Sequence, residues 1–189
     1  MNREIRTDLA IEMRESVQGN TDMEGVRVKT SINDDKSIRT TTIDVLNETG
    51  EKSLGKAKGR YITIESRHLK EPDETINEMI RDELGGKLRL LVGECDNILV
   101  VGLGNRQVTP DSIGPLVVDN LFITRHLEPT PKEGITLSAI CPGVMAQTGI
   151  ETLDIVRGIC EKIDADAVIA VDALAARSSK RLNTTIQIT

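Results

Sequence analysis

The sequence predicts an α/β protein with a mostly parallel sheet flanked by helices, preceded by a β-rich region. Two short apolar runs, at residues 98–101 and 167–171, are typical of strands buried on both faces. Amphipathic segments between them indicate helices. A third observation is the alternation of Val, Ile and Thr with polar residues over residues 26–43, which predicts half-exposed antiparallel strands. A length of 189 residues suits one domain, or one domain with a small appendage.

The composition disfavours several classes of function. A net charge of −6 argues against non-specific nucleic-acid binding, which needs a basic surface. We find no signal peptide and no apolar run of membrane length, so we expect a cytoplasmic protein that does not bind membranes. Only Tyr61 and Phe122 are aromatic, so the core must consist of aliphatic side chains.

The cysteines and histidines show no metal-binding pattern. The three cysteines are widely spaced, no CxxC pair occurs, and His68 lies far from His126. We therefore expect reduced thiols, no bound metal and no other cofactor. A catalytic Cys141 is an alternative, because this residue begins a loop after a predicted strand, but the aspartates are better candidates.

The chain divides into three parts in the sequence. Residues 1–25 are polar and charged, which indicates an edge strand, a loose helix or an N-terminal arm. Residues 26–70 form the β-rich region, and residues 71–189 form the α/β core. Turns and a loop inside the β-rich region are expected at residues 33–35, 47–50 and 53–60.

Helices should alternate with strands in the α/β core. Asp73 is a plausible N-cap for a helix that Gly85 and Gly86 would end, before a second helical stretch at residues 88–92. Residues 148–151 match a capping box, with Thr followed by Glu three residues later, and predict the start of another helix. Right-handed crossovers would make the core strands parallel.

A glycine turn follows the first buried strand. Gly102 and Gly104 allow a tight turn, and Asp111 follows, just before a helix expected over residues 113–122. A third glycine at the dinucleotide-binding spacing is missing, which disfavours a nucleotide site. Asp111 is then either an N-cap or a catalytic group at the carboxyl end of a strand.

A second carboxylate follows the second buried strand. Parallel strands would bring Asp172 to the same sheet edge as Asp111. Two neighbouring carboxylates do not both ionise easily, so one can act as acid and the other as base on a water that attacks a carbonyl. The pair could equally hold a metal, or Asp172 could simply end its strand. Three basic residues follow, namely Arg177, Lys180 and Arg181. They could bind substrate, or they could simply form a solvated face.

Seven segments spread over the chain carry longer motifs. They are residues 5–10, 60–65, 101–105, 108–115, 142–152, 171–177 and 181–188. Together they resemble the germination proteases of spore-forming bacteria, which are endopeptidases that degrade small acid-soluble spore proteins. The resemblance extends over essentially the whole chain.

The resemblance implies an unusual class of aspartic endopeptidase. Its two catalytic aspartates match Asp111, in Thr-Pro-Asp-Ser-Ile-Gly, and Asp172, in Val-Asp-Ala-Leu-Ala-Ala-Arg. Asn105 and Arg177 are the expected substrate-binding or oxyanion residues. A fold similar to that of hydrogenase maturation proteases is also implied. In those proteins a glycine turn and the acidic residue after it hold a metal, whereas germination proteases are not generally described as metal-dependent.

Regulation and location are implied as well. The family is made as an inactive homotetrameric zymogen in the forespore and removes its own propeptide. By analogy the cut would fall just before or within residues 5–10. The protein would then act on small acid-soluble spore proteins in the cytoplasm of the spore core.

Family members continue past Thr189, so we expect a C-terminally truncated form with an incomplete α/β core. A strand at residues 186–188 would then be left as an unpaired edge. Two other functions remain open: a non-catalytic fragment that only binds a partner subunit or a spore protein, and a metal-assisted maturation-type protease.

Overall fold

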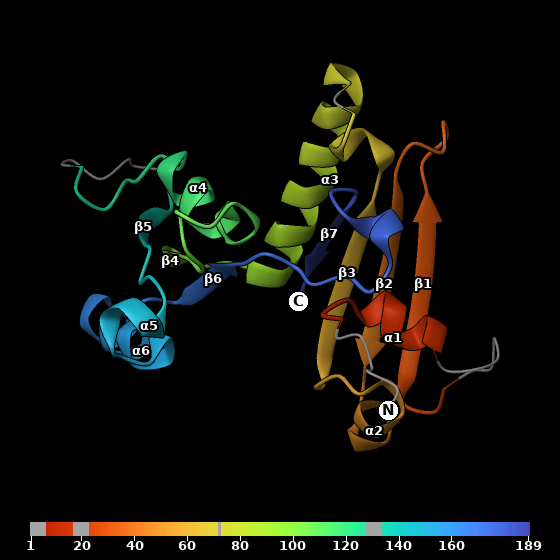
Figure 1. The fold of residues 1–189 in the computed structure, drawn as a ribbon, viewed down its shortest axis with the longest axis horizontal. Coiled ribbons are helices and arrows are strands. Elements are labelled where there is room, and N and C mark those ends of the chain that lie inside the picture. The colour runs from red at the N-terminus through yellow and green to blue at the C-terminus, as the bar shows by residue number, and fades with distance from the viewer. Residues whose placement is uncertain (1–6, 17–22, 72, 128–133) are drawn as a thin grey trace. The chain divides into compact units, whose positions relative to one another are not determined.

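The computed structural model describes residues 7–16, 23–71, 73–127 and 134–189 (Figure 1). The chain forms two compact units. Unit 1 comprises Met1–Leu91 and Leu174–Thr189, and unit 2 comprises Val92–Ala173. Part of the expected N-terminal arm lies outside the described residues, as does the start of the segment in which self-cleavage was expected.

Unit 1 is built on a four-stranded antiparallel sheet with the order β1-β2-β3-β7. The alternating Val, Ile and Thr residues supply its first strands, as the sequence predicts, and a turn at residues 33–35 joins the first two. The strands are β1 (Val26–Ile32), β2 (Arg39–Val45), β3 (Gly59–Glu65) and β7 (Thr185–Ile188).

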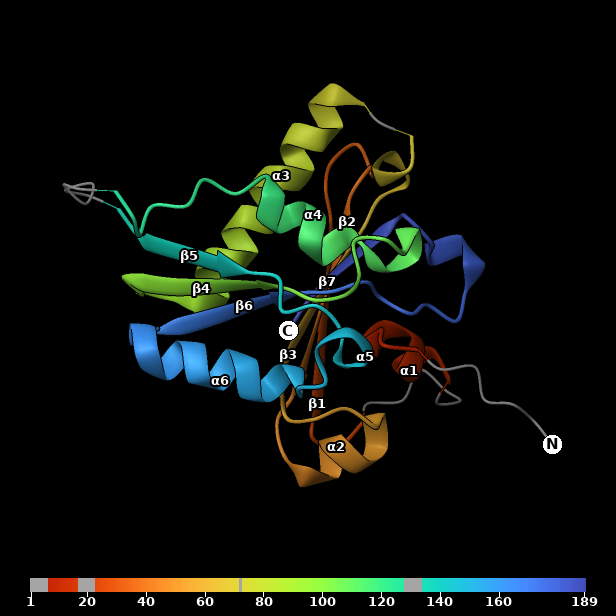
Figure 2. The same cartoon turned by 60° about the vertical axis from the view of Figure 1, so that its left-hand side comes forward.

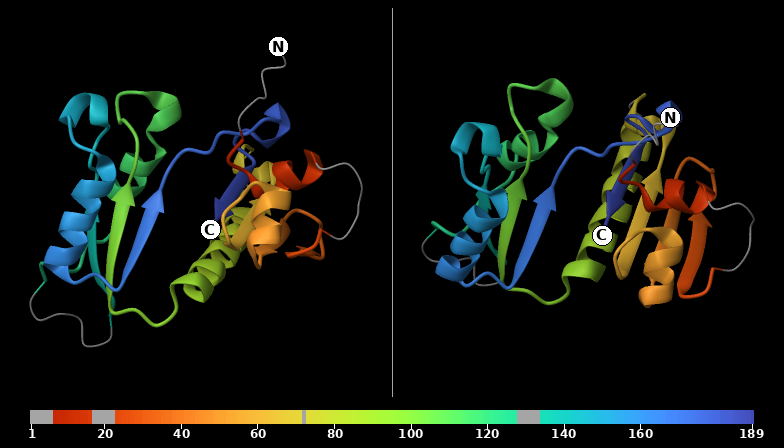
Figure 3. Two further views of the ribbon diagram at one scale, coloured as in Figure 1. Left: turned by 90° about the horizontal axis from the view of Figure 1, so that it is seen from below. Right: turned by 60° about the horizontal axis from the view of Figure 1, so that its bottom comes forward.

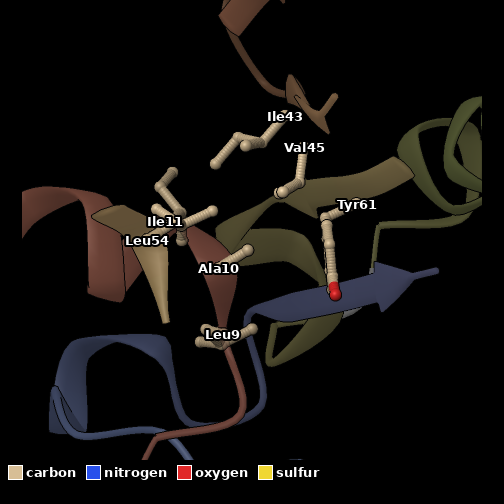
Figure 4. Close-up of a cluster of buried hydrophobic side chains, with 7 residues drawn as sticks. All are labelled: Leu9, Ala10, Ile11, Ile43, Val45, Leu54 and Tyr61. Carbon is tan, nitrogen blue, oxygen red and sulfur yellow. The ribbon is translucent and has the colours of Figure 1, made fainter. Parts of the chain in front are cut away.

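Helices cover both faces of this sheet (Figure 3). On one face, α1 and α2 pack on Ile43, Val45 and Tyr61 (Figure 4). On the other face, α3 packs Ile80 against Ile64 and its neighbours. The helical segments are α1 (Ala10–Ser16), α2 (Glu48–Leu54), α3 (Glu74–Val92) and the 3₁₀ turns η1 (Arg67–Leu69) and η3 (Ser179–Arg181).

Two predicted boundaries in unit 1 are wrong. The turn expected at residues 47–50 is the start of α2, because the Asn47 side chain accepts a 3.0 Å hydrogen bond from the Gly50 amide and caps the helix. Gly85 and Gly86 do not end α3. Neither has a positive φ, and the glycine in the left-handed region is Gly93, which directly follows the helix end at Val92.

The expectation of an unpaired strand at residues 186–188 is also wrong. β7 pairs antiparallel with β3, with Ile186 opposite Ile64 and Ile188 opposite Ile62. The chain thus returns from unit 2 to complete the sheet of unit 1. Sequence periodicity identified the strand but could not identify its partner, which lies more than a hundred residues earlier.

Unit 2 contains a three-stranded parallel sheet, and the parallel direction of its strands is as predicted. The strand order is β5-β4-β6. α4 lies on one face and α6 on the other (Figure 2). The elements are β4 (Asn97–Gly102), η2 (Thr109–Asp111), α4 (Ile113–Asp119), β5 (Thr136–Ile140), α5 (Met145–Thr148), α6 (Thr152–Ile163) and β6 (Ala167–Val171).

The capping box expected at residues 148–151 is wrong. Thr148 ends α5, and its hydroxyl bonds with residues of its own turn. Glu151 is the N-cap of α6, without a side-chain capping bond. The helix ends at Asp164, its C-cap, which lies in the left-handed region with a φ of 54°. No helix within the described residues is long and apolar enough to cross a membrane.

Candidate catalytic site

The candidate site lies in unit 2, where β4 and β6 end side by side (Figure 3). The register pairs Gly102 with Val171, and the Leu103 amide donates a 2.9 Å hydrogen bond to the Val171 carbonyl. Asp172 is therefore the first residue beyond this pair of strand ends. Open α/β sheets place their sites at the carboxyl ends of parallel strands.

Asp111 is held over the glycine turn at the same edge. Its carbonyl accepts a 2.9 Å hydrogen bond from the Asn105 amide. Gly104 has a φ of 106°, and a Cβ atom there would lie 2.1 Å from the carbonyl oxygen and 2.9 Å from the Oδ1 of Asp111. Glycine at this position therefore allows Asp111 to pack directly on the turn.

Asp111 does not cap the following helix. It lies in η2, and Ser112 occupies the N-cap position of α4. Asp111 is half-buried, and within the described residues no protein group donates a hydrogen bond to its carboxylate. The side chain is therefore available to water or to a substrate, and the N-cap interpretation is wrong.

The first turn of α4 packs directly on both strand ends. A Cβ atom at the buried Gly114 would lie 2.3 Å from the Leu103 carbonyl oxygen and 2.5 Å from that of Val171. Leu103 thus contacts Val171, the residue before Asp172. The next residue, Gly104, contacts Asp111. This arrangement brings the two aspartates to neighbouring positions on one edge.

Two polar side chains complete the edge. Asp172 is exposed, and its Oδ1 accepts a 2.8 Å hydrogen bond from the Ala173 amide. The Oδ1 of Asn105 accepts a 2.9 Å bond from the Gln107 amide, which leaves the NH₂ group of Asn105 as a donor. Two carboxylates can act as acid and base, and an amide donor can stabilise an oxyanion, so these groups suit the hydrolysis of a carbonyl compound.

Arg177 belongs to unit 1, not to the unit that carries the aspartates. Its guanidinium donates a 2.8 Å hydrogen bond to the Glu12 carbonyl and another bond to the Ser16 hydroxyl. Arg181 is also engaged, in ion pairs with Glu12, Glu15 and Glu65. A role for Arg177 toward substrate stays a prediction.

The buried carboxylate of Glu12, whose side chain is 1% exposed, was not among the residues predicted from the sequence. The amides of Arg177 and Ser178 donate to it at 2.7 and 2.9 Å. Burial by itself raises the pKa of Glu12, but the Thr7 hydroxyl, these two amides and the Arg181 guanidinium together lower it to about 2. No local pattern marks this residue, because its main partners lie about 165 positions later.

Cys141 is a weaker candidate than the aspartates. Its side chain is exposed directly after β5, yet partial burial of the thiol raises its pKa, and the nearby Arg106 offsets this only in part. Asp119, which is ion-paired with Arg106, raises the pKa further. Because the thiolate is the reactive form, a raised pKa argues against catalysis by Cys141.

Metal-binding groups are sparse in the part of the chain that the structure describes. There, no three His, Cys, Asp or Glu side chains lie close enough to one another to hold a metal ion. An ion at the sheet edge would have to be held by the two aspartates together with water or backbone oxygens.

The chain matches one family over nearly its whole length. Residues 4–189 fit the family described as germination protease. The chain is 42% identical to the germination protease of Priestia megaterium and 43% identical to that of Clostridium acetobutylicum, with 97% of this chain covered in each case. The alignments cover 54% and 59% of those relatives. The chain therefore spans about half the length of the curated relatives it matches.

Proposed function

Because the chain belongs to the germination protease family, we propose that it carries the catalytic aspartates of an endopeptidase that hydrolyses small acid-soluble spore proteins during germination. The match over nearly the whole chain supports a hydrolase that cuts peptide bonds. The Priestia megaterium relative is longer, with 54% of its length covered. The activity, the substrates and the partners of a complete protein are therefore part of this proposal.

Asp111 and Asp172 are proposed to act together as an acid–base pair. One carboxylate removes a proton from a water molecule, whose oxygen attacks the carbonyl carbon of the peptide bond. The other carboxyl group gives a proton to the leaving nitrogen as the C–N bond breaks. One water molecule is thereby divided between the two products. The Asn105 amide group would donate to the oxygen that becomes negatively charged.

One observation carries the pairing of these residues. Leu103 and Gly104 are consecutive, and Leu103 bonds to the carbonyl just before Asp172 while Gly104 lies directly against Asp111. One tight turn thus contacts Asp111 and the residue before Asp172, which supports the proposal that the two aspartates act as a pair. A pair used for acid–base chemistry needs such a fixed separation.

The remaining family properties are proposed on the resemblance alone. They are a homotetrameric zymogen, removal of its own propeptide, and action in the cytoplasm of the forespore and the spore core. Leu9 and Ala10 are fully buried in the core of unit 1 (Figure 4). A cut before Thr7 would leave this core intact, whereas a cut after Ala10 would remove part of it.

The proposal is tested by cleavage of a purified small acid-soluble spore protein, followed by intact mass. We expect defined cuts by the wild type and a loss of at least about a hundredfold in Asp111→Asn and in Asp172→Asn. Asp119→Asn is the control, because Asp119 is an exposed carboxylate of the same unit that pairs with Arg106. It should cut at nearly the wild-type rate.

The other candidate functions give different results in the same assay. No cuts from a folded wild type would contradict the protease and leave the binding-only fragment, which should still retain the spore protein in a pull-down. Loss of cleavage on adding a chelator would favour the metal-assisted protease. Indifference to chelator, with loss in Asp111→Asn, would favour the carboxylate pair.

A further inference from the structure

Ser112 joins the turn that carries Asp111 to the helix α4, and all of these residues lie within unit 2. Ser112 is buried, with 8% of its surface exposed. Its hydroxyl donates a 2.9 Å hydrogen bond to the Thr109 carbonyl, and its amide donates to the same carbonyl at 3.4 Å. The hydroxyl therefore makes the shorter of the two bonds by which Ser112 closes η2.

The hydroxyl of Ser112 does not act as the side chain of an N-cap residue usually does. A serine at this position ordinarily accepts a hydrogen bond from an amide in the first turn of its helix. Ser112 makes no such bond, and its φ of −99° and ψ of −6° are not those of an extended residue. Its carbonyl begins α4 by accepting a 3.0 Å bond from the Leu116 amide. The backbone of Ser112 thus starts the helix, while its side chain holds the preceding turn.

We propose that Ser112 is a positioning residue for Asp111. The amide of Asp111 donates to the Val108 carbonyl at 2.8 Å, and its carbonyl accepts from the Asn105 amide. Both partners lie in the same loop, so these bonds close the loop on itself but do not connect it to α4. Ser112 makes that connection where the loop ends, and Gly114 packs α4 on the strand ends. This inference rests on the proposed function, in which Asp111 is one of the two acid–base groups.

The carboxylate of Asp111 depends on this restraint, because within the described residues no protein group donates a hydrogen bond to it. Its direction therefore follows from the backbone of η2, in which Pro110 limits one torsion angle and the Ser112 hydroxyl closes the turn. A displacement of about 1 Å in a reacting group can cost roughly a hundredfold in rate. Without the hydroxyl, Ser112 would hold the Thr109 carbonyl only through its 3.4 Å amide bond, which is long for a hydrogen bond.

Amide hydrogen exchange at Asp111 tests the restraint without any substrate. This amide donates to the Val108 carbonyl, so its exchange rate reports how often the turn opens. Ser112→Ala removes the hydroxyl but keeps the backbone bonds of residue 112, so the fold should survive. We expect exchange at Asp111 to rise by about fivefold. Unchanged exchange at Asp111 in a folded Ser112→Ala would overturn the proposal.

Two further variants separate positioning from general destabilisation. Ser112→Thr keeps the hydroxyl and should restore protection at Asp111 together with most of the cleavage rate. Thr124→Val is the matched control, because the Thr124 hydroxyl also donates to a backbone carbonyl of unit 2, that of Ile135 at 2.8 Å, just before β5 begins. It should leave both exchange at Asp111 and kcat within about twofold of the wild type. If Thr124→Val acted as strongly as Ser112→Ala, or if Ser112→Thr behaved like Ser112→Ala, the proposal would be wrong.

Cleavage kinetics form an independent second measurement. With Ser112→Ala we expect kcat to fall by about tenfold while KM stays within about twofold, since a displaced catalytic group affects the chemical step. Asp111→Asn is measured beside it. Full activity in Asp111→Asn would refute the proposed function and leave the exchange result standing. Loss in Asp111→Asn with an unchanged kcat in Ser112→Ala would refute the positioning role alone.

Discussion

Glu12 shows how the protein keeps a buried carboxylate charged. Burial disfavours the ionised form, but two backbone amides, a hydroxyl and the Arg181 guanidinium surround the two oxygens. The result is a pKa of about 2 against an ordinary value of 4.5. Removing one partner from such a cluster leaves an uncompensated buried charge, which is costly.

This shift makes the stability of unit 1 depend on pH. A folded-state pKa below the unfolded one contributes stability that is fully present above about pH 4.5 and is lost as the pH falls toward 2. The contribution at neutral pH is on the order of 3 kcal/mol. Urea unfolding at pH 5 and pH 3 measures the loss of this contribution, with the fluorescence of Tyr61 as the signal. Tyr61 is a suitable probe because it is the single tyrosine and lies in the unit 1 core, and because the chain has no Trp.

Glu12→Gln supplies the comparison for that measurement. The variant cannot ionise at this position, so its stability should fall less between pH 5 and pH 3 than that of the wild type. Carboxylates that share no partner with Glu12, such as Asp35, whose pKa hydrogen bonds from Ser37 lower, titrate in both proteins and cancel in the difference. Equal losses in the two proteins would show that Glu12 is not the group responsible.

Single functional residues can be predicted from the sequence only where they follow a recognisable local pattern. Asp111 and Asp172 could be singled out because each follows a buried apolar run, and the fold does place both at one sheet edge. Glu12 and Asp8 could not, because the amides they bind lie about 165 positions away. Which hydrogen-bonding groups meet across such distances is decided by the fold.

Among the elements, α4 depends on a single glycine for its position. Gly114 lies in the first turn of this helix, where a Cβ atom would meet backbone oxygens of Leu103 and Val171 at 2.3 and 2.5 Å. The Val171 oxygen cannot move aside easily, because it accepts a hydrogen bond from the Leu103 amide. The glycine therefore sets how closely α4 approaches the strand ends that carry the candidate site.

Two Gly→Ala variants of unit 2 should have opposite effects. Gly114→Ala should lower the free energy of unfolding by about 1–3 kcal/mol through overpacking. Gly158→Ala, in α6, has no neighbouring atom within 4 Å of the added methyl group. It should raise stability by roughly 1 kcal/mol through helix propensity. Urea unfolding followed by far-ultraviolet circular dichroism distinguishes them, and a stabilising Gly114→Ala would contradict the tight packing described.

Element types were more predictable than element ends. Alternation and apolar runs identified the strands of both sheets, since side-chain period follows directly from strand geometry. The predicted end of α3 was wrong because Gly85 and Gly86 keep a helical backbone, whereas the glycine with a positive φ is Gly93, after the helix. The sequence did not decide the structure of residues 10–16, because the segment is short. Packing on the sheet fixes it as a helix.

In the molecule as a whole, the chain leaves unit 1 at residue 91 and returns to it at residue 174. The returning segment supplies β7, the edge strand beside β3, together with Arg181 and its three carboxylate partners. Unit 1 is therefore discontinuous in sequence, which no periodicity could reveal. Its stability should depend on residues close to Thr189.

Ile186→Ala tests this dependence. Ile186 lies in β7 and packs against the cluster formed by Ile38, Ile64 and Ile80. We expect the substitution to lower the free energy of unfolding by about 1–2 kcal/mol, less than at a fully buried site. The shift should appear in the urea transition reported by Tyr61 fluorescence. Thr189→Ala, at an exposed position, is the control, and an equal response of the two variants would contradict the role given to β7.

Joint action of Asp111 and Asp172 is tested most directly by the cleavage rates of Asp111→Asn, Asp172→Asn and the double variant on a small acid-soluble spore protein. Residues that act as one unit lose nearly all of their contribution when either is removed. We therefore expect the double variant to be no slower than the slower single variant. A double variant whose loss equals the product of the two single losses, or a single variant that cuts at the wild-type rate, would contradict the pair.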